Sequence, residues 1–183
     1  MKSESLRDLY LEQLKDLYNA EQQLIKALPK MAKAASSDEL RGTFEEHLEK
    51  TKGHAERITT IFEQMGEKVE GKKCKAMEGL VKEGGEVIKE DMTEALKDAA
   101  LIAAAQRVEH YEIAGYGCVR TYATILEDQQ AADLLTQTLE EEKEADESLS
   151  RIAGLLNLQV PAEPQQSEKR VANPSQRKPK SAA

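Results

Sequence analysis

The chain has 183 residues, a length that suits one domain with a hydrophobic core of its own. Charged residues make up 33% of the chain and the net charge is −8, so we expect no strong binding to nucleic-acid phosphates. No apolar run reaches the roughly 18 residues of a membrane span, and residues 1–14 show no apolar signal core, so we expect a cytoplasmic protein without a membrane partner.

Two long helices are predicted in the first third of the chain. Apolar residues recur every three or four positions over residues 6–35, the pattern of an amphipathic helix. Ser36 or Ser37 can cap a second helix, whose apolar face covers residues 40–62. This helix should end near the glycine-containing segment 64–73. The short connection between the two helices favours an antiparallel hairpin.

Three further helices are predicted after this hairpin. Residues 74–90 indicate a shorter helix, weakened by two adjacent glycines. Long helices follow at about 93–127 and 129–158, and residues 127–130 make a second tight connection. The order is therefore hairpin, long crossover with its own short helix, and hairpin. This order predicts an all-α four-helix bundle over residues 1–160.

The composition changes at Pro161. Residues 161–183 contain four prolines, few apolar residues and a cluster of positive charge. By composition this is a disordered tail, whose solubilising role is favoured over weak contact with an acidic partner or nucleic acid.

Acidic residues interrupt the apolar stripes of three long helices, close to the midpoint of each helix. They are Glu21 in the first helix, Glu109 and Glu112 in the 93–127 helix, and Glu142 and Asp146 in the 129–158 helix. A single glutamate in an acidic helical chain is usually a surface residue, and charge runs such as residues 140–144 are usually solvated. The midpoints of antiparallel helices meet, however, so these acids are expected to converge inside the bundle.

Converging buried carboxylates predict a metal site. A buried carboxylate must be protonated, paired or bound to a metal, and several in one place repel each other. Oxygen ligands with a nitrogen or two suit iron or manganese. Di-iron bundles use one Glu from each of two helices and a Glu-x-x-His from each of the other two. No Glu-x-x-His exists here, because Phe44, Thr51 and Arg107 precede the three histidines at that spacing.

The helix at 40–62 offers histidine beside its core line. His54 is the favoured ligand from this helix, with His47 and Glu49 as alternatives. The candidate metal ligands are therefore Glu21, His54, Glu109, Glu112, Glu142 and Asp146. They would hold a di-iron or manganese centre, with a metal-free bundle as the alternative.

Five segments of the chain resemble one known family. They are "YNAEQQL" (18–24), "HLEKT" (47–51), "CKAMEGL" (74–80), "DAALIAAAQRVEHYEIAGYG" (98–117) and "LEEEKEADESL" (139–149). Together they resemble the YciF/YciE family of bacterial ferritin-like proteins, over nearly everything before Pro161. Where this chain has Lys50, the family usually has a second glutamate, "HLEET".

The resemblance implies a rubrerythrin-like four-helix bundle with a short extra helix in the crossover. It also implies a metal site within the bundle, a link to stress responses and a homodimer, but no established reaction. The family's carboxylates correspond to the same five acids, and Lys50 makes the contribution of residues 47–54 the least defined.

Two functions remain open at this point. The first is a stress-associated metal protein with oxidase or peroxide-consuming activity, for which two bridged irons could share the electrons required. The alternative is a non-catalytic structural or interaction protein, which the missing Glu-x-x-His motifs favour. A storage shell is not expected, because there is no evident shell-building end helix. For the homodimer, Leu11, Ile25, Ile61 and Leu134 lie off the core lines and could leave apolar surface to cover.

Overall fold

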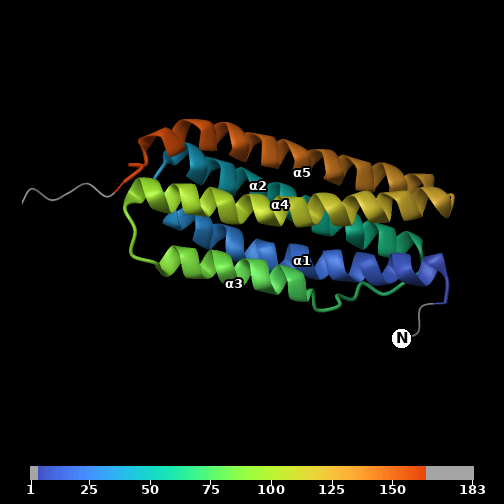
Figure 1. Ribbon diagram of the computed structural model, residues 1–183. Helices are drawn as coiled ribbons and strands as arrows, with labels where there is room; N and C mark the ends of the chain where they lie inside the picture. Colours follow the sequence, from blue (N-terminus) through green and yellow to red (C-terminus); the bar gives the residue numbers. More distant parts are fainter. Residues whose placement is uncertain (1–3, 164–183) are drawn as a thin grey trace, which may run out of the picture.

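The computed structural model describes residues 4–163, and this part of the chain is helical throughout its regular elements (Figure 1). The elements are α1 (Leu6–Ala34), α2 (Asp38–Gln64), α3 (Lys75–Lys89), α4 (Glu94–Ile125), α5 (Gln129–Leu156) and a 3-10 turn, η1 (Asn157–Gln159). Over residues 4–163 there is no strand, which confirms the all-α prediction. The helix bounds lie within a few residues of those expected from the apolar periodicity.

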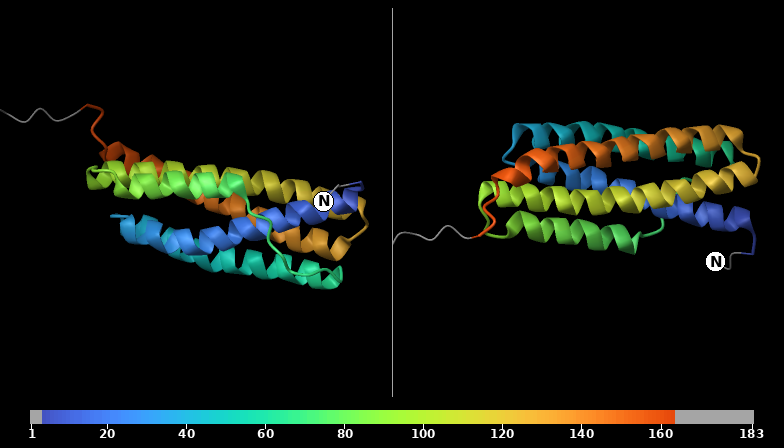
Figure 2. Two further views of the ribbon diagram at one scale, coloured as in Figure 1. Left: turned by 90° about the horizontal axis from the view of Figure 1, so that it is seen from below. Right: turned by 45° about the horizontal axis from the view of Figure 1, so that its top comes forward.

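The four long helices form two antiparallel hairpins, α1–α2 and α4–α5 (Figures 1 and 2). Contacts of α2 with α5 and of α1 with α4 close these hairpins into a bundle. Helix α3 lies in the crossover and packs on the outside, against α1 and α4. This is the predicted four-helix bundle with an additional helix between its hairpins.

The link between α1 and α2 is held by a carboxylate from α4. Asp98 is buried, and its two oxygens accept hydrogen bonds from the backbone N–H groups of Ser36 and Ser37, each at 2.8 Å. The Ser37 side chain in turn accepts from the N–H of Leu40 and caps α2. Backbone donors at a helix start otherwise lack partners, so these bonds fix where α2 begins and tie the hairpin to α4.

A polar layer divides the hydrophobic core into two clusters. Leu24, Phe44, Val108 and Leu149 belong to one cluster and Leu17, Ile58, Tyr116 and Leu139 to the other. Between these two sets lie buried polar residues from each long helix: Glu21, His47, Thr51, His54, Glu109, Glu112 and Glu142. The midpoints of the four helices therefore meet in a layer that is polar and shielded from solvent.

The apolar side chains that were expected to leave surface for a dimer are largely buried by contacts within the chain itself. The expectation was wrong for Ile61, which is fully buried in the core. Leu11 and Leu134 are half-buried and pack against the same cluster. Ile25 is half-buried as well.

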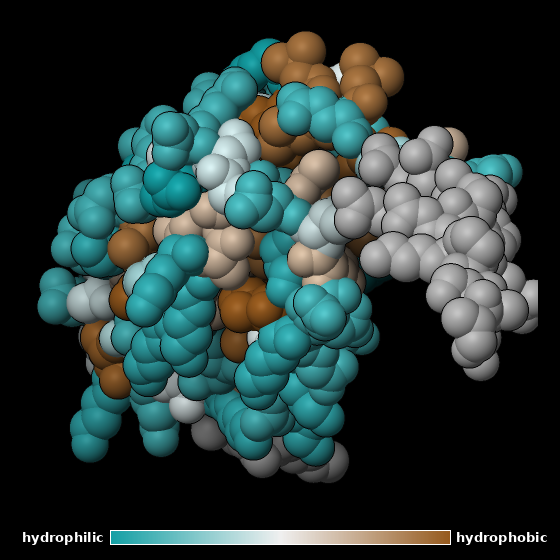
Figure 3. Space-filling view, turned by 90° about the vertical axis from the view of Figure 1, so that its left-hand side faces the viewer, coloured by the Kyte–Doolittle hydropathy of each residue, from teal (hydrophilic) through white to brown (hydrophobic). Residues whose placement is uncertain are grey.

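More exposed apolar side chains occur where α4 begins and α5 ends. They include Leu96 and Leu155, and Leu158 of η1 follows them. Figure 3 shows this end of the molecule, where apolar patches interrupt a largely hydrophilic surface. None of the helices over residues 4–163 is both long and apolar enough to span a membrane. Most of the predicted tail, residues 164–183, lies outside the described residues.

Candidate metal centre

Six ionisable side chains from the four long helices lie in the polar layer. They are Glu21 from α1, His47 and His54 from α2, Glu109 and Glu112 from α4, and Glu142 from α5. All six are buried, and none is more than 6% exposed. Residues three or four apart share one face of a helix, so the regular helices bring these groups to the interior without any break in the backbone.

The side chains form two adjoining groups with metal-ligand spacing. His47, Glu109, Glu112 and Glu142 make one group, and Glu21, His54 and Glu142 make the other. In each group, one ligand atom from every residue lies within 4.8 Å of the others. Glu142 belongs to both, so the arrangement is that of two neighbouring cation positions that share one carboxylate.

Most of the ligand atoms have no hydrogen-bond partner. These atoms are Oε2 of Glu21 and of Glu109, both carboxylate oxygens of Glu112 and of Glu142, both ring nitrogens of His47 and Nδ1 of His54. Buried polar atoms are nearly always satisfied, because leaving one unpaired costs free energy. Four carboxylates and two imidazoles with unused lone pairs therefore fit a pair of divalent cations such as iron or manganese.

The two histidines stand between acids. His54 Nδ1 lies 2.9 Å from Glu142 Oε1, without hydrogen-bond geometry, and 3.7 Å from Glu21 Oε1. His47 Nε2 lies 3.5 Å from Glu109 Oε1 and 3.7 Å from Glu142 Oε2. Each imidazole thus faces the carboxylates of its own group.

The protein without metal holds protons in this layer. Burial, followed by repulsion from neighbouring carboxylates, raises the pKa values of Glu109 and Glu112 well above that of an ordinary glutamate. Burial also raises the pKa of Glu21 to about 8, although His54 opposes the rise. For Glu142, burial is outweighed by the adjacent histidines, chiefly His54, and the pKa is lowered. These acids cannot all be ionised together unless cations replace the protons.

The two imidazoles differ in charge. Burial lowers the pKa of His47, which keeps the ring neutral and suited to binding a cation. Burial acts in the same direction on His54, but the carboxylates around it, first Glu142, raise its pKa to about 8. In the metal-free protein His54 is therefore the positive charge that balances Glu142.

Glu141 holds His54 from outside the two groups. Both oxygens of Glu141 accept from the Arg57 guanidinium at 2.8 Å, and one lies 2.9 Å from His54 Nε2. Burial would raise the pKa of Glu141, but Arg57 and the other donors lower it to about 2. An ionised carboxylate can only accept, so the Nε2 proton of His54 points to Glu141, and Nδ1 faces Glu21 and Glu142.

Glu141 was not among the predicted site residues, because it lies in the charge run at 140–144. A second supporting group is Tyr116, which is buried and donates a hydrogen bond to Glu21 Oε1. Burial, followed by the negative charge of Glu21, raises the pKa of Tyr116, so the phenol keeps its proton.

Five of the six residues expected to converge do so: Glu21, His54, Glu109, Glu112 and Glu142. Asp146 lies outside both groups; its Oδ1 accepts from Gln106 Nε2 at 3.1 Å and lies 3.6 Å from His110 Nε2. Whether any of the six binds metal stays a prediction.

His47, the alternative to His54, lies in the layer beside it, whereas Glu49 is exposed and paired with Lys52. A signal for both histidines was present in the sequence. Phe44, His47, Thr51, His54 and Ile58 follow one another at spacings of three and four, which places both rings on the core line of α2.

Comparisons with known proteins agree on one family. The model of a domain of unknown function, DUF892, matches residues 5–160. Protein YciF of Escherichia coli strain K12 is 47% identical over 154 residues, which are 84% of this chain and 93% of YciF.

Solved structures extend the likeness to the fold. The crystal structure of YciF, described as an E. coli stress protein, is similar with a TM-score of 0.83 and 45% identity, over 86% of this chain and 100% of that one. YcfI from Rhodopseudomonas palustris, described as a candidate structural protein, has a TM-score of 0.78 and 41% identity, over 80% and 94%. A dodecameric thioferritin from Bacteroides fragilis has a TM-score of 0.65 over 85% and 90%; at 17% identity it shows a ferritin-like fold and no more.

Proposed function

The chain belongs to the YciF family, as the DUF892 match over residues 5–160 shows, and on this basis we propose that its polar layer is a dinuclear iron or manganese centre in a stress-associated protein. The observation that carries the proposal is the set of unpartnered donor atoms from four helices, with Glu142 common to both groups. The description of YciF as a stress protein supports the physiological part.

Each residue of the layer has a distinct task in this proposal. His47, Glu109 and Glu112 would hold one cation, Glu21 and His54 the other, and Glu142 would bridge the two. When bound, two ferrous or manganous ions supply together the electron pair that converts hydrogen peroxide to water or dioxygen to peroxide.

The remaining residues bind, orient and exclude water. The Arg57–Glu141 pair orients the His54 ring, and Tyr116 holds a proton at Glu21 Oε1. The two apolar clusters on either side of the layer exclude bulk water, which strengthens the attraction between the carboxylates and a cation. The proposed activity is therefore peroxide or dioxygen consumption at a dry, carboxylate-rich centre.

A structural role without metal is the second candidate. It is favoured by YcfI, which is 41% identical and described as a candidate structural protein. In that case the layer would keep its protons, and the acids would serve only to set the register of the four helices.

Metal content decides between the two candidates. The purified protein, exposed to ferrous or manganous ion without oxygen and then desalted, should retain about two ions per chain by elemental analysis. Glu142→Gln should lower the retained metal below one ion, because both groups lose a ligand. Glu45→Gln, an exposed glutamate on α2, serves as the matched control and should retain the wild-type amount. If wild type and Glu142→Gln retain equally little metal, the proposal fails and the structural role stands.

We also propose a homodimer, on the family resemblance alone. Sedimentation at micromolar concentration should give the mass of two chains, and a single-chain mass would contradict it.

A further inference from the structure

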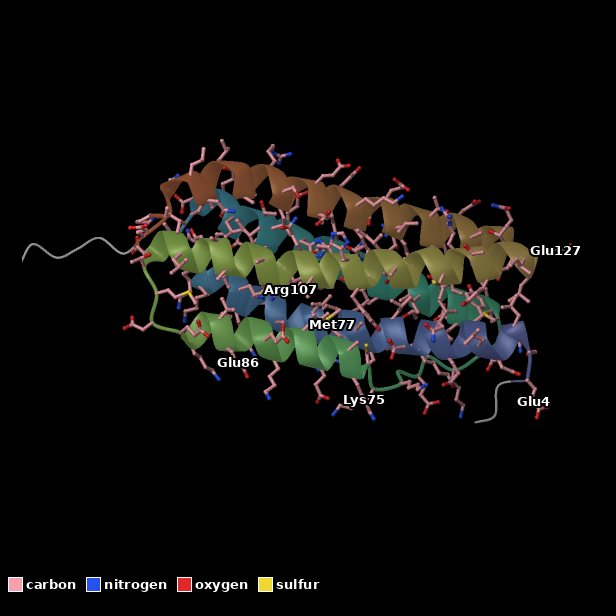
Figure 4. The ribbon with its side chains drawn as sticks, in the orientation of Figure 1. Glu4, Lys75, Met77, Glu86, Arg107 and Glu127 are labelled. Atoms are coloured by element: carbon pink, nitrogen blue, oxygen red, sulfur yellow. The ribbon has the colours of Figure 1, made fainter. Side chains whose placement is uncertain are left out.

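A small apolar cavity lies between α1, α3 and α4, with a volume of about 80 Å³. Its walls include Leu24 and Met31 of α1, Leu80 and Val81 of α3, and Ala104 and Val108 of α4. It is separate from the polar layer, and neither the packing of the core nor the proposed ligands account for it. Helix α3 covers it, and Figure 4 shows Met77 of this helix pointing into the bundle, while Lys75 and Glu86 point away.

Gly84 of α3 keeps this cavity open. The residue is buried and lines the cavity, yet a Cβ added to it would meet no heavy atom within 4 Å. No neighbour therefore requires glycine here, although glycine inside a helix costs about 1 kcal/mol relative to alanine. Because glycine has no side chain, space stays empty at this position that a larger apolar residue would fill.

The size and chemistry of the cavity select a small apolar molecule. Its volume is about half that of the ~150 Å³ apolar cavity that admits benzene or xenon. A buried water needs two to four polar partners, and Lys30 is the one charged residue among the described lining residues. Hydrogen peroxide would lose its hydrogen bonds here as water does, whereas dioxygen has none to lose.

Two residues of the inner wall lie close along their helices to candidate metal ligands. Leu24 follows Glu21 by one helical turn, and Val108 directly precedes Glu109. On the outer side, Lys30, Gly85 and Ile88 line both the cavity and an open surface groove between α1 and α3. The residues that line the cavity therefore extend from the surface groove to the turns of α1 and α4 that contain Glu21 and Glu109.

We propose that this cavity is a dioxygen site that supplies the metal centre, an inference that rests on the proposed function. It predicts that dioxygen, and not peroxide, reaches the centre past Gly84. Gly84→Leu would fill the cavity. Gly79→Leu is the matched control, because Gly79 lies on the same helix, is exposed and meets nothing within 4 Å.

The first test uses the metal-free protein and dissolved dioxygen, whose unpaired electrons broaden nearby methyl resonances in NMR spectra. Methyl groups of Leu24 and Val108 should broaden several-fold more than those of Leu17 and Leu135, which are also buried but belong to the other cluster. Gly84→Leu should abolish the difference and Gly79→Leu should keep it. Equal broadening of both sets in wild type would overturn the proposal whether or not the protein binds metal.

The second test compares oxidants in the ferrous-loaded protein. Gly84→Leu should slow iron oxidation by dioxygen several-fold and leave oxidation by peroxide and the metal content unchanged. Should Gly84→Leu unfold, Gly84→Ala narrows the same space with a single methyl group and should give a smaller effect of the same kind. The proposed route for dioxygen would be overturned if the folded Gly84 variants oxidised iron with dioxygen as fast as wild type. It would also be overturned if they were slowed equally with dioxygen and with peroxide. Failure of wild type to bind iron would instead refute the proposed function. The broadening measurement would still show whether dioxygen enters the cavity.

Discussion

Replacing Glu21 with glutamine should stabilise the metal-free protein. Glutamine has the same shape, and its amide oxygen can still accept the hydrogen bond from Tyr116. It removes, however, a carboxyl group whose pKa is raised by burial to about 8 in the folded chain, from an ordinary value of 4.5. Between these two pH values the native state holds a proton that the unfolded chain has released, so wild-type stability falls as the pH rises through this range.

The size of the effect follows from the pH. Each pH unit above 4.5, up to the folded pKa, costs the native state about 1.4 kcal/mol. Glu21→Gln should therefore raise the free energy of unfolding by less than about 1 kcal/mol at pH 5 and by roughly 3 kcal/mol at pH 7. Urea unfolding in the presence of a chelator measures both values. Glu45→Gln, which is exposed, should change them by less than about 0.5 kcal/mol.

Metal should reduce the advantage in stability that Glu21→Gln has over wild type. A cation at 100 times its dissociation constant stabilises the native state by about 2.7 kcal/mol, and a variant that lacks one ligand gains less. In manganous buffer Glu21→Gln should therefore gain less stability than wild type. The reasoning is refuted if Glu21→Gln fails to stabilise the chelated protein at pH 7, or if its effect is the same at pH 5 and pH 7.

Other changes test the support of the site, the packing and the tail. Glu141→Gln should lower metal affinity by about 10- to 100-fold by loosening the histidine ring that it holds, with ligand titration as the measurement. Gly115→Ala should cost about 1–3 kcal/mol in thermal unfolding, because its Cβ would lie 2.7 Å from Cδ2 of the buried Leu17. Gly117→Ala on the same helix meets nothing and should be neutral or stabilising. Removing residues 164–183 should leave the melting temperature nearly unchanged, and a large loss would show that the tail docks.

Most of the fold could be predicted from helical periodicity. Apolar residues at spacings of three and four identify the buried face of a helix, because that spacing matches 3.6 residues per turn. The same rule placed Glu21, Glu109, Glu112 and Glu142 inside the bundle, since each fills a position in an apolar register. The two short connections then indicate that each pair of long helices forms an antiparallel hairpin.

Periodicity identifies which face of a helix is buried, but it does not show which residues of the other helices this face contacts. Asp146 lies one turn after Glu142, yet there it faces Gln106 and His110 of α4 instead of the other acids. Ile61 lay off the predicted core line of α2 and is nevertheless fully buried.

Glu141 shows what only the tertiary structure decided. From the sequence it is one acid in a charged run, and the adjacent Glu142 points about 100° away from it around the helix. Its partners, Arg57 and His54, are 84 and 87 residues away along the chain. The sequence by itself determined that acids would lie inside four antiparallel helices. Which acids share a cation position, and which hold a histidine in place, depends on how α2 packs against α5, because side chains so far apart in sequence meet only when the helices do.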